Sequence, residues 1–278
     1  MFYLIKMNYK NKLLLKTSTK YIYLVRIIKR MKYITGTLYY LWKIYIGIAF
    51  AFTLVIFYPI LLFFIYNSSL KQFTFRVNIC WSRCMRILCF YAVEETFEDA
   101  KIKGPFVLVA NHSSYLDIFL LYSILPHHQF LFMGKSEILK YPLVKTFFKG
   151  LNIPVDRSSS IKSARAFIQA RKEINKNWSI VIFPEGGIPD DAPQLAPFKS
   201  GAFQLAQAAK CPILPITFIN HYYLFSDPDT FCAPAKPGLA KVHIHCMISA
   251  HEVVESDVET LKEKTYRLIK SQLPQKNA

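Results

Sequence analysis

Residues 106–117 read FVLVANHSSYLD, a short apolar run followed by a polar turn and the start of a second apolar stretch. The run at 106–110 is typical of a short buried strand. Ser114-Tyr-Leu-Asp117 is typical of a helix beginning, because a serine cap is followed three residues later by an acid. A strand that leads through a turn into a helix indicates an α/β fold.

The chain beyond residue 101 repeats this alternation of short apolar runs and helical patterns. It therefore predicts a mixed, mostly parallel sheet flanked by helices. We expect strands at 106–110, 130–133, 152–155, 179–183, 213–219 and 242–248, and helices at 117–124, 163–175, 200–210 and 257–273.

The positive charge of the chain lies in its N-terminal third. The net charge is +17, yet residues 1–93 hold 14 Lys and Arg and no acid, since Glu94 is the first acidic residue. The basic residues flank an uncharged 23-residue run, Ile44 to Tyr66, long enough at about 34 Å to cross a bilayer core. A membrane therefore explains this charge better than nucleic acid does.

A second predicted helix, at about 71–92, follows this run. Arg76, Arg83 and Arg86 share one arc of its surface, with Trp81 and Cys84 on the other, so we expect it to lie at the interface with its apolar face in the acyl region. Because basic residues lie on both sides of the apolar run, a hairpin kinked at Pro59 is slightly favoured over one clean crossing. The predicted division is a basic segment (1–43), anchor helices (44–93) and an α/β domain (94–278). Residues 1–30 are interpreted as a misassigned extension before Met31.

His112 and Asp117 are the first candidates for chemistry. A hydroxyl is a poor nucleophile at neutral pH, so an attack by it requires a base such as imidazole, which a carboxylate can orient. Five residues on a regular helix would separate the two side chains by about 140°. They can meet only if His112 lies in a turn and Asp117 in the first helical turn. The alternative is that Asp117 only caps the helix and His112 is an ordinary loop residue.

Three further segments carry polar or glycine-rich turns. Gly150–Arg157 ends a predicted strand with Arg157, a cation suited to phosphate, and Phe183-Pro-Glu-Gly-Gly187 follows the next strand. Phe198-Lys199-Ser200-Gly201 opens a helix whose N-terminus favours an anion. Each segment alone has an ordinary reading as a surface turn or strand exit.

Taken in order, these blocks resemble the glycerolipid acyltransferase family, typified by 1-acylglycerol-3-phosphate acyltransferases, over roughly residues 80–250. The resemblance implies that His112 is the general base and that Asp117 orients it. It also implies that the block ending in Arg157 and the block containing Glu185, Gly186 and Gly187 bind the glycerol and phosphate of the acceptor. Lys135 matches a basic position of the family, Cys211-Pro-Ile-Leu-Pro215 matches a block that supports the acyl donor, and Lys199 is a further candidate cation.

The predicted function is therefore transfer of a fatty acyl chain from acyl-CoA or acyl carrier protein to lysophosphatidic acid, at a bacterial inner membrane with the catalytic domain facing the cytoplasm. The expected partners are membrane lipids and the acyl donor, without nucleic acid. One departure affects the acceptor, since Gly187 and Ile188 stand where many members have Thr-Arg. Acylation of glycerol-3-phosphate or a lyso-aminolipid, or noncatalytic binding of anionic lipid, stays open.

No cofactor and no metal are expected. The six cysteines lack Cys-x-x-Cys pairing and are read as small apolar residues of a reducing compartment. His243 and His245 share a strand face, but no carboxylate partner is evident from the sequence, so a surface or core strand is the expected reading.

Overall fold

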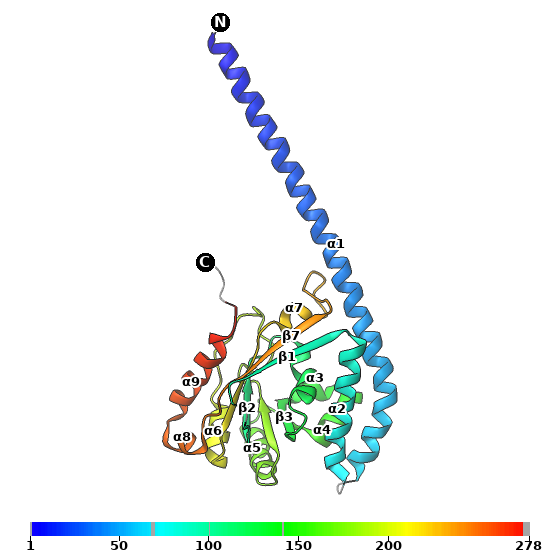
Figure 1. Cartoon of the computed structure of the whole chain (residues 1–278), viewed down its shortest axis with the longest axis vertical. Coiled ribbons are helices and arrows are strands. Elements are labelled where there is room, and N and C mark those ends of the chain that lie inside the picture. The colour runs from blue at the N-terminus through cyan, green and yellow to red at the C-terminus, as the bar shows by residue number, and fades with distance from the viewer. Residues whose placement is uncertain (1, 68–69, 100, 141, 275–278) are drawn as a thin grey trace.

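A seven-stranded sheet with helices on both sides forms the centre of the computed structural model, which describes residues 2–67, 70–99, 101–140 and 142–274 (Figure 1). The strand order is β1-β7-β6-β2-β5-β3-β4. Five adjacent strands run parallel, whereas β7 runs antiparallel to β6 and parallel to the edge strand β1. The prediction of a mixed, mostly parallel sheet is confirmed. The strands are β1 (Tyr91–Phe97), β2 (Val107–Ala110), β3 (Phe130–Lys135), β4 (Ile153–Val155), β5 (Ser179–Ile182), β6 (Ile213–Phe218) and β7 (Gly238–Ile244).

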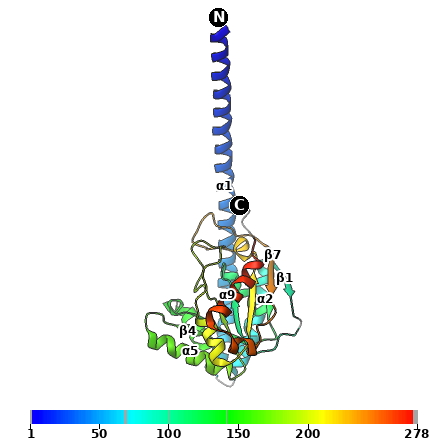
Figure 2. The same ribbon diagram turned by 90° about the vertical axis from the view of Figure 1, so that its left-hand side faces the viewer.

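The order in which the parallel strands are visited places the helices in two layers. The chain passes outward from β2 through β3 to β4, then reverses to β5 and on to β6, and right-handed crossovers put the two groups of connections on opposite faces. Figures 1 and 2 show this arrangement. One layer holds α3 (Tyr115–Ile124), η2 (Ser136–Lys140) and α4 (Pro142–Leu151), and the other α5 (Ser160–Ile174), α6 (Gly201–Ala209), α8 (Ala250–Glu255) and α9 (Val258–Ser271), while α7 (His221–Leu224) follows β6.

The N-terminal third folds as two antiparallel helices on the α3 side of the sheet. Helix α1 (Phe2–Tyr66) continues through Pro59, and α2 (Lys71–Leu88) returns beside it. The predicted hairpin bend at Pro59 is wrong, because the chain reverses only after Tyr66. Trp81 of α2 is buried between the helices and donates a hydrogen bond from Nε1 to Thr53 Oγ1 of α1 at 2.9 Å, so it does not face outward as expected.

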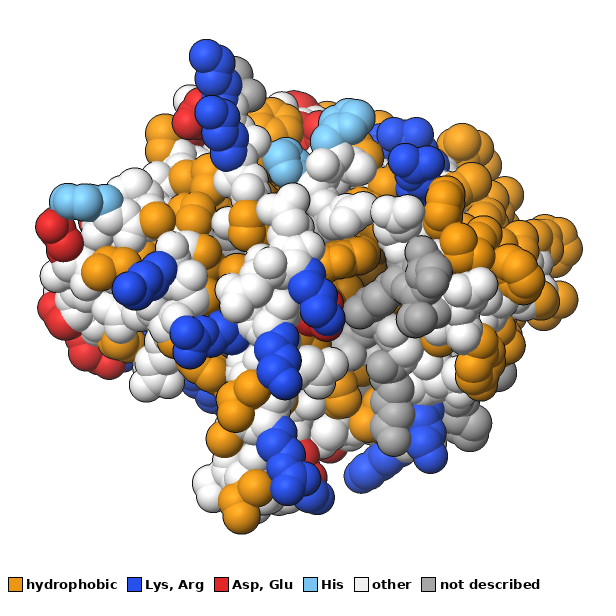
Figure 3. Space-filling model, turned by 90° about the horizontal axis from the view of Figure 1, so that it is seen from below, with side chains coloured by type: hydrophobic (Ala, Val, Ile, Leu, Met, Phe, Trp, Pro, Cys, Tyr) orange, Lys and Arg blue, Asp and Glu red, His pale blue; other side chains and the backbone are white. Residues whose placement is uncertain are grey.

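Among the described residues, one helix is long and apolar enough to cross a membrane, the segment Tyr23–Tyr66 of α1. Much of its apolar surface is exposed, including the side chains of Ile48, Phe52, Val55 and Phe63. Hydrophobic side chains also gather on the α1 and α2 side of the molecule in the view from below (Figure 3). The predicted division into three segments stays a prediction.

Two element boundaries differ from expectation at the sheet edge. The predicted second helix ends at Leu88 instead of Ala92, because Tyr91 begins β1, which pairs along its whole length with β7. Strand β7 covers Gly238–Ile244 instead of 242–248. Both errors have one cause. Apolar and polar residues alternate only weakly along β1, and the strand that pairs with it lies about 147 residues later in the chain, so the sequence around β1 does not identify it as a strand.

Candidate active site

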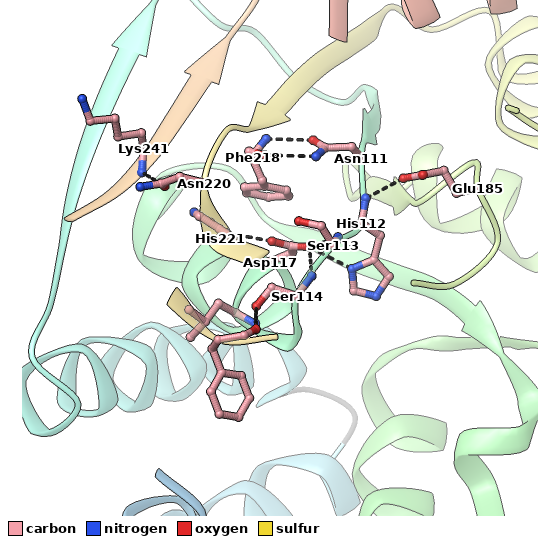
Figure 4. A network of polar contacts seen from close by, with 12 residues as sticks. Asn111, His112, Ser113, Ser114, Asp117, Glu185, Phe218, Asn220, His221 and Lys241 are labelled. Atoms are coloured by element: carbon pink, nitrogen blue, oxygen red, sulfur yellow. Dashed lines mark hydrogen bonds and ion pairs between the residues drawn. The ribbon is translucent and has the colours of Figure 1, made fainter. Parts of the chain in front are cut away.

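Asn111 fixes the turn that carries His112, directly after β2. Its side chain hydrogen-bonds both backbone groups of Phe218 at the end of β6, donating to the carbonyl at 3.0 Å and accepting from the amide at 2.8 Å (Figure 4). The side-chain amide of Asn111 thus makes the two hydrogen bonds to β6 that the backbone would make if β2 continued by one more pair. The carboxyl ends of parallel strands are the usual ligand edge of such sheets, and His112 lies there.

His112 and Asp117 are in direct contact. Asp117 is the third residue of α3 and accepts from His112 Nδ1 through Oδ2 at 2.9 Å. The same oxygen accepts from the backbone amides of Ser113 and Ser114 at 2.8 and 2.9 Å, and Ser114 caps the helix. Capping and contact with His112 are therefore compatible, because the cap holds Asp117 where the imidazole reaches it.

The ring of His112 is fixed by stacking as well as by the hydrogen bond from Nδ1. It stacks on Phe183 with the ring centroids 4.1 Å apart and the planes 15° from parallel. An ionised carboxylate can only accept, so Nδ1 carries the proton of the neutral ring and Nε2 keeps its lone pair. Nε2 is the ring atom that can take a proton from a bound molecule.

A second histidine, His221, contacts the other oxygen of Asp117. Its Nδ1 lies 2.7 Å from Oδ1, and both side chains are fully buried. Asn220 fixes the start of α7 by bonding β7 at the Leu239 carbonyl and the Lys241 amide (Figure 4). Burial by itself would raise the pKa of Asp117, but the hydrogen bonds from His112 and His221 bring it below its usual range. Sequence reasoning missed His221, which is 104 residues from Asp117 and belongs to no recognised pattern.

Glu185 connects the His112 turn to the loop at 189–197. Oε1 accepts from the His112 amide at 2.7 Å and Oε2 from the Ala196 amide at 2.8 Å. Burial raises the pKa of Glu185 to about 7, although these two amide bonds oppose the rise. In this structure the carboxylate positions two backbone segments, and its expected contact with a substrate hydroxyl stays a prediction.

Three cationic side chains converge on the Gly186-Gly187 backbone. A Cβ built on Gly186 would lie 2.6 Å from Lys199 Nζ and 2.7 Å from Arg157 Nη1, and a Cβ on Gly187 would lie 3.1 Å from Lys135 Nζ. Gly186 has a φ of +89°, which suits glycine. Arg157 donates to the Gly186 carbonyl at 3.3 Å, while Asp156 pairs with Lys162 instead. The pKa of Lys199 is lowered, first by the charge of Arg157, then by burial and then by the charge of Lys135. An anion bound among these cations would reduce their mutual repulsion.

The structure therefore brings together every predicted site residue at one sheet edge. His112 follows β2, Lys135 ends β3, Arg157 follows β4, Glu185 to Gly187 follow β5, and Lys199 precedes α6. The class that this fold and site define is an α/β protein with a carboxylate-oriented histidine beside a cluster of cations. Such a site can remove a proton next to a bound anion.

Comparisons with known proteins agree with this class. Residues 92–219 match the family model described as Acyltransferase. It is 33% identical over 151 residues to the 1-acyl-sn-glycerol-3-phosphate acyltransferase of Saccharomyces cerevisiae, covering 53% of this chain and 49% of the relative. It is 30% identical over 186 residues to the human 1-acyl-sn-glycerol-3-phosphate acyltransferase beta, covering 62% and 63%.

A solved structure shares the fold. The 1-acyl-sn-glycerophosphate (LPA) acyltransferase PlsC from Thermotoga maritima superimposes with a TM-score of 0.67 at 21% identity, covering 85% of this chain and 95% of that one. The chain spans between about half and just under two thirds of the length of the yeast and human relatives.

Proposed function

We propose that this chain transfers a fatty acyl group from an acyl thioester to the free hydroxyl of 1-acylglycerol-3-phosphate. One observation carries the proposal: a histidine–aspartate pair and a cluster of three cations are joined by residues 185–187. Glu185 accepts a hydrogen bond from the His112 amide. Gly186 lies beside Arg157 and Lys199, and Gly187 lies beside Lys135. A substrate with both a phosphate and a nearby hydroxyl fits this combination. The names of the relatives support the same acceptor.

In the proposed reaction, His112 Nε2 takes the proton of the acceptor hydroxyl as its oxygen attacks the thioester carbonyl carbon. The carbon–sulfur bond then breaks, and the imidazolium returns the proton to the leaving thiolate. Asp117 stabilises the imidazolium and holds the ring in the required tautomer. The proposed thioester donor is acyl-CoA or acyl-acyl carrier protein.

The phosphate of the acceptor binds Arg157, Lys199 and Lys135 in this proposal. Guanidinium and ammonium groups form charge-assisted hydrogen bonds with phosphate oxygens, and the glycine backbone lets them approach closely. These cations take the place of the arginine that is absent at Ile188. The N-terminus of α6, which begins at Gly201, adds a favourable dipole.

In this proposal, attachment of helix α1 to a membrane brings the active site to an acceptor that lies in the bilayer. Lysophosphatidic acid is an amphiphile held in a bilayer, so its acylation requires a site at the membrane surface. The exposed apolar residues of α1 between Ile44 and Tyr66 support attachment of the chain to a membrane. A bacterial inner membrane with the domain on the cytoplasmic side is part of the proposal.

The deciding experiment measures thiol release by the full chain in lipid–detergent micelles, with labelled acyl-CoA or acyl carrier protein. The acceptors are lysophosphatidic acid, glycerol-3-phosphate and a panel of lysolipids without a phosphomonoester. We expect turnover with lysophosphatidic acid and a loss of roughly 10²–10⁴-fold for His112→Ala. His251→Ala, at an exposed helix position, is the matched control and should keep full activity.

A different acceptor is the second candidate function, because Gly187 and Ile188 replace Thr-Arg. Faster turnover of glycerol-3-phosphate or a lyso-aminolipid would transfer the assignment to that acceptor. Lipid binding without any thiol release would instead identify a noncatalytic lipid-binding protein and refute the acyltransferase proposal.

A further inference from the structure

A cluster of two histidines and a carboxylate lies apart from the site described above. His243 is in β7, His245 follows that strand directly, and Glu98 follows the paired edge strand β1. Because β7 runs antiparallel to β6, its carboxyl end points away from the sheet edge that carries His112. The sequence showed no carboxylate partner for His243 and His245, and the structure supplies Glu98 from the neighbouring strand.

The three side chains point at one another. Glu98 Oε1 lies 2.7 Å from His243 Nε2 and 3.2 Å from His245 Nδ1, and the ligating atoms of all three lie within 4.8 Å of one another. The second oxygen of Glu98 accepts from the Cys246 amide at 2.8 Å, so the carboxylate is fixed in its orientation. His245 is buried, His243 nearly so, and Glu98 is open to solvent. A small ion can therefore enter from the Glu98 side.

The partners of His245 determine which of its nitrogens is free. Thr217 Oγ1 lies 2.9 Å from His245 Nε2 and donates to the Ile269 carbonyl of α9 at 3.2 Å. Both contacts are hydrogen bonds only when Nε2 carries the proton and the threonine proton points at the carbonyl. The neutral ring then directs the lone pair of Nδ1 at a carboxylate oxygen 3.2 Å away. Two lone pairs that face each other at this distance require a positive charge between them, either a proton or a metal ion.

We propose that Glu98, His243 and His245 bind a divalent transition-metal ion of the zinc class. Zinc takes imidazole nitrogen and carboxylate oxygen as ligands, and three protein ligands leave a position for water from the open side. The Thr217 contact is the usual second partner of a ligating imidazole, which fixes the ring and its tautomer. Such an ion would join β1, which follows the anchor helices, to β7 across roughly 145 residues of chain, and so hold the edge strand in the sheet.

The alternative to the metal is a second proton on His245, which would form an ion pair with Glu98. The two alternatives differ in a measurable quantity, because only a metal site binds metal in a defined ratio to the protein. The metal content of the protein does not depend on acyl transfer, so this test is independent of the proposed function.

The experiment uses the full chain in detergent micelles, prepared without a histidine tag. The protein is dialysed against a low concentration of Zn²⁺, and bound metal is measured by mass spectrometry together with the thermal unfolding midpoint. We expect about one zinc per chain and a midpoint that rises with Zn²⁺. Glu98→Gln, which keeps the shape of the side chain, and His243→Gln should each weaken zinc binding by at least roughly 10-fold.

Two controls separate this site from others. His251→Gln removes an exposed histidine that pairs with Glu255 on its own helix, and it should keep the bound zinc. Thr217→Val removes the second partner of His245 and should weaken binding roughly 10–100-fold while leaving the three ligands in place. Absence of zinc from the wild-type chain, or zinc that Glu98→Gln and His243→Gln leave unchanged, would overturn the proposal.

Discussion

The carboxylate of Asp117 is shared by two histidines, and the one at 2.7 Å, His221, has no access to solvent. Within the described part of the chain, His221 Nε2 has no hydrogen-bond partner. Its Nδ1–H is therefore its one polar contact, and that contact is with Oδ1, the oxygen that does not face His112. We therefore propose that His221 is a positioning residue, which holds the Asp117 carboxylate from the side opposite to His112.

We expect His221→Phe to lower kcat by about 10–100-fold with little change in KM. The ring shape is kept, but Oδ1 of buried Asp117 loses its donor, a defect that costs about 1–3 kcal/mol. His221→Asn, whose amide can donate in nearly the same place, should restore part of the rate. Steady-state kinetics with the preferred acceptor, together with the pH dependence of kcat, measure the effect. Equal rates for wild type and His221→Phe would contradict the positioning role.

The cluster of Arg157, Lys199 and Lys135, which we propose binds phosphate, predicts a selective loss of affinity for the acceptor. Arg157→Gln and Lys199→Gln should each raise the KM for lysophosphatidic acid by roughly 10-fold, since each removes a charge-assisted hydrogen bond to phosphate. Lys172→Gln, at an exposed position of α5, is the matched control and should leave KM unchanged. If the cluster variants lost affinity equally for an acceptor without a phosphate, the cluster would not be a phosphate site.

Glu185 predicts that stability falls as pH rises. Its pKa is raised from 4.5 to about 7 in the folded chain, so the folded state holds a proton that the unfolded state has released over that interval. The free energy of unfolding should therefore decrease from about pH 5 to about pH 7, by up to roughly 3 kcal/mol from this group. Thermal unfolding midpoints of wild type and Glu185→Gln measure the effect, and the variant should show a flatter dependence. Parallel curves for the two proteins would refute the assignment to Glu185.

Thr53 predicts a stability defect confined to the helix pair. Thr53→Val keeps the side-chain shape but removes the acceptor of the Trp81 indole, which lies buried between α1 and α2. We expect a destabilisation of about 1–3 kcal/mol, seen as a lower unfolding midpoint in detergent. Thr35→Val, at an exposed position of the same helix, is the control and should have no effect. Equal midpoints for the two variants would show that this bond does not stabilise the pair.

Much of the candidate site could be predicted because its parts are local in the sequence. The strand at 107–110, the turn at His112 and the cap by Ser114 and Asp117 all lie within eleven residues, and each follows from the residue types present. The approach of Arg157, Glu185 and Lys199 was also predictable in outline. Each follows a parallel strand or opens a helix, and such positions meet at one sheet edge.

The sequence by itself therefore determined the α/β pattern and the apolar N-terminal helix, and it indicated His112 and Asp117 as a candidate pair. Tertiary structure alone decided that His221 completes the Asp117 contacts and that Glu98 faces His243 and His245. The physical reason is that these contacts join segments more than 100 residues apart, and no local pattern of propensity or hydropathy specifies them. They arise because the sheet order places β6 beside β2, and β7 beside β1, after the strands have formed.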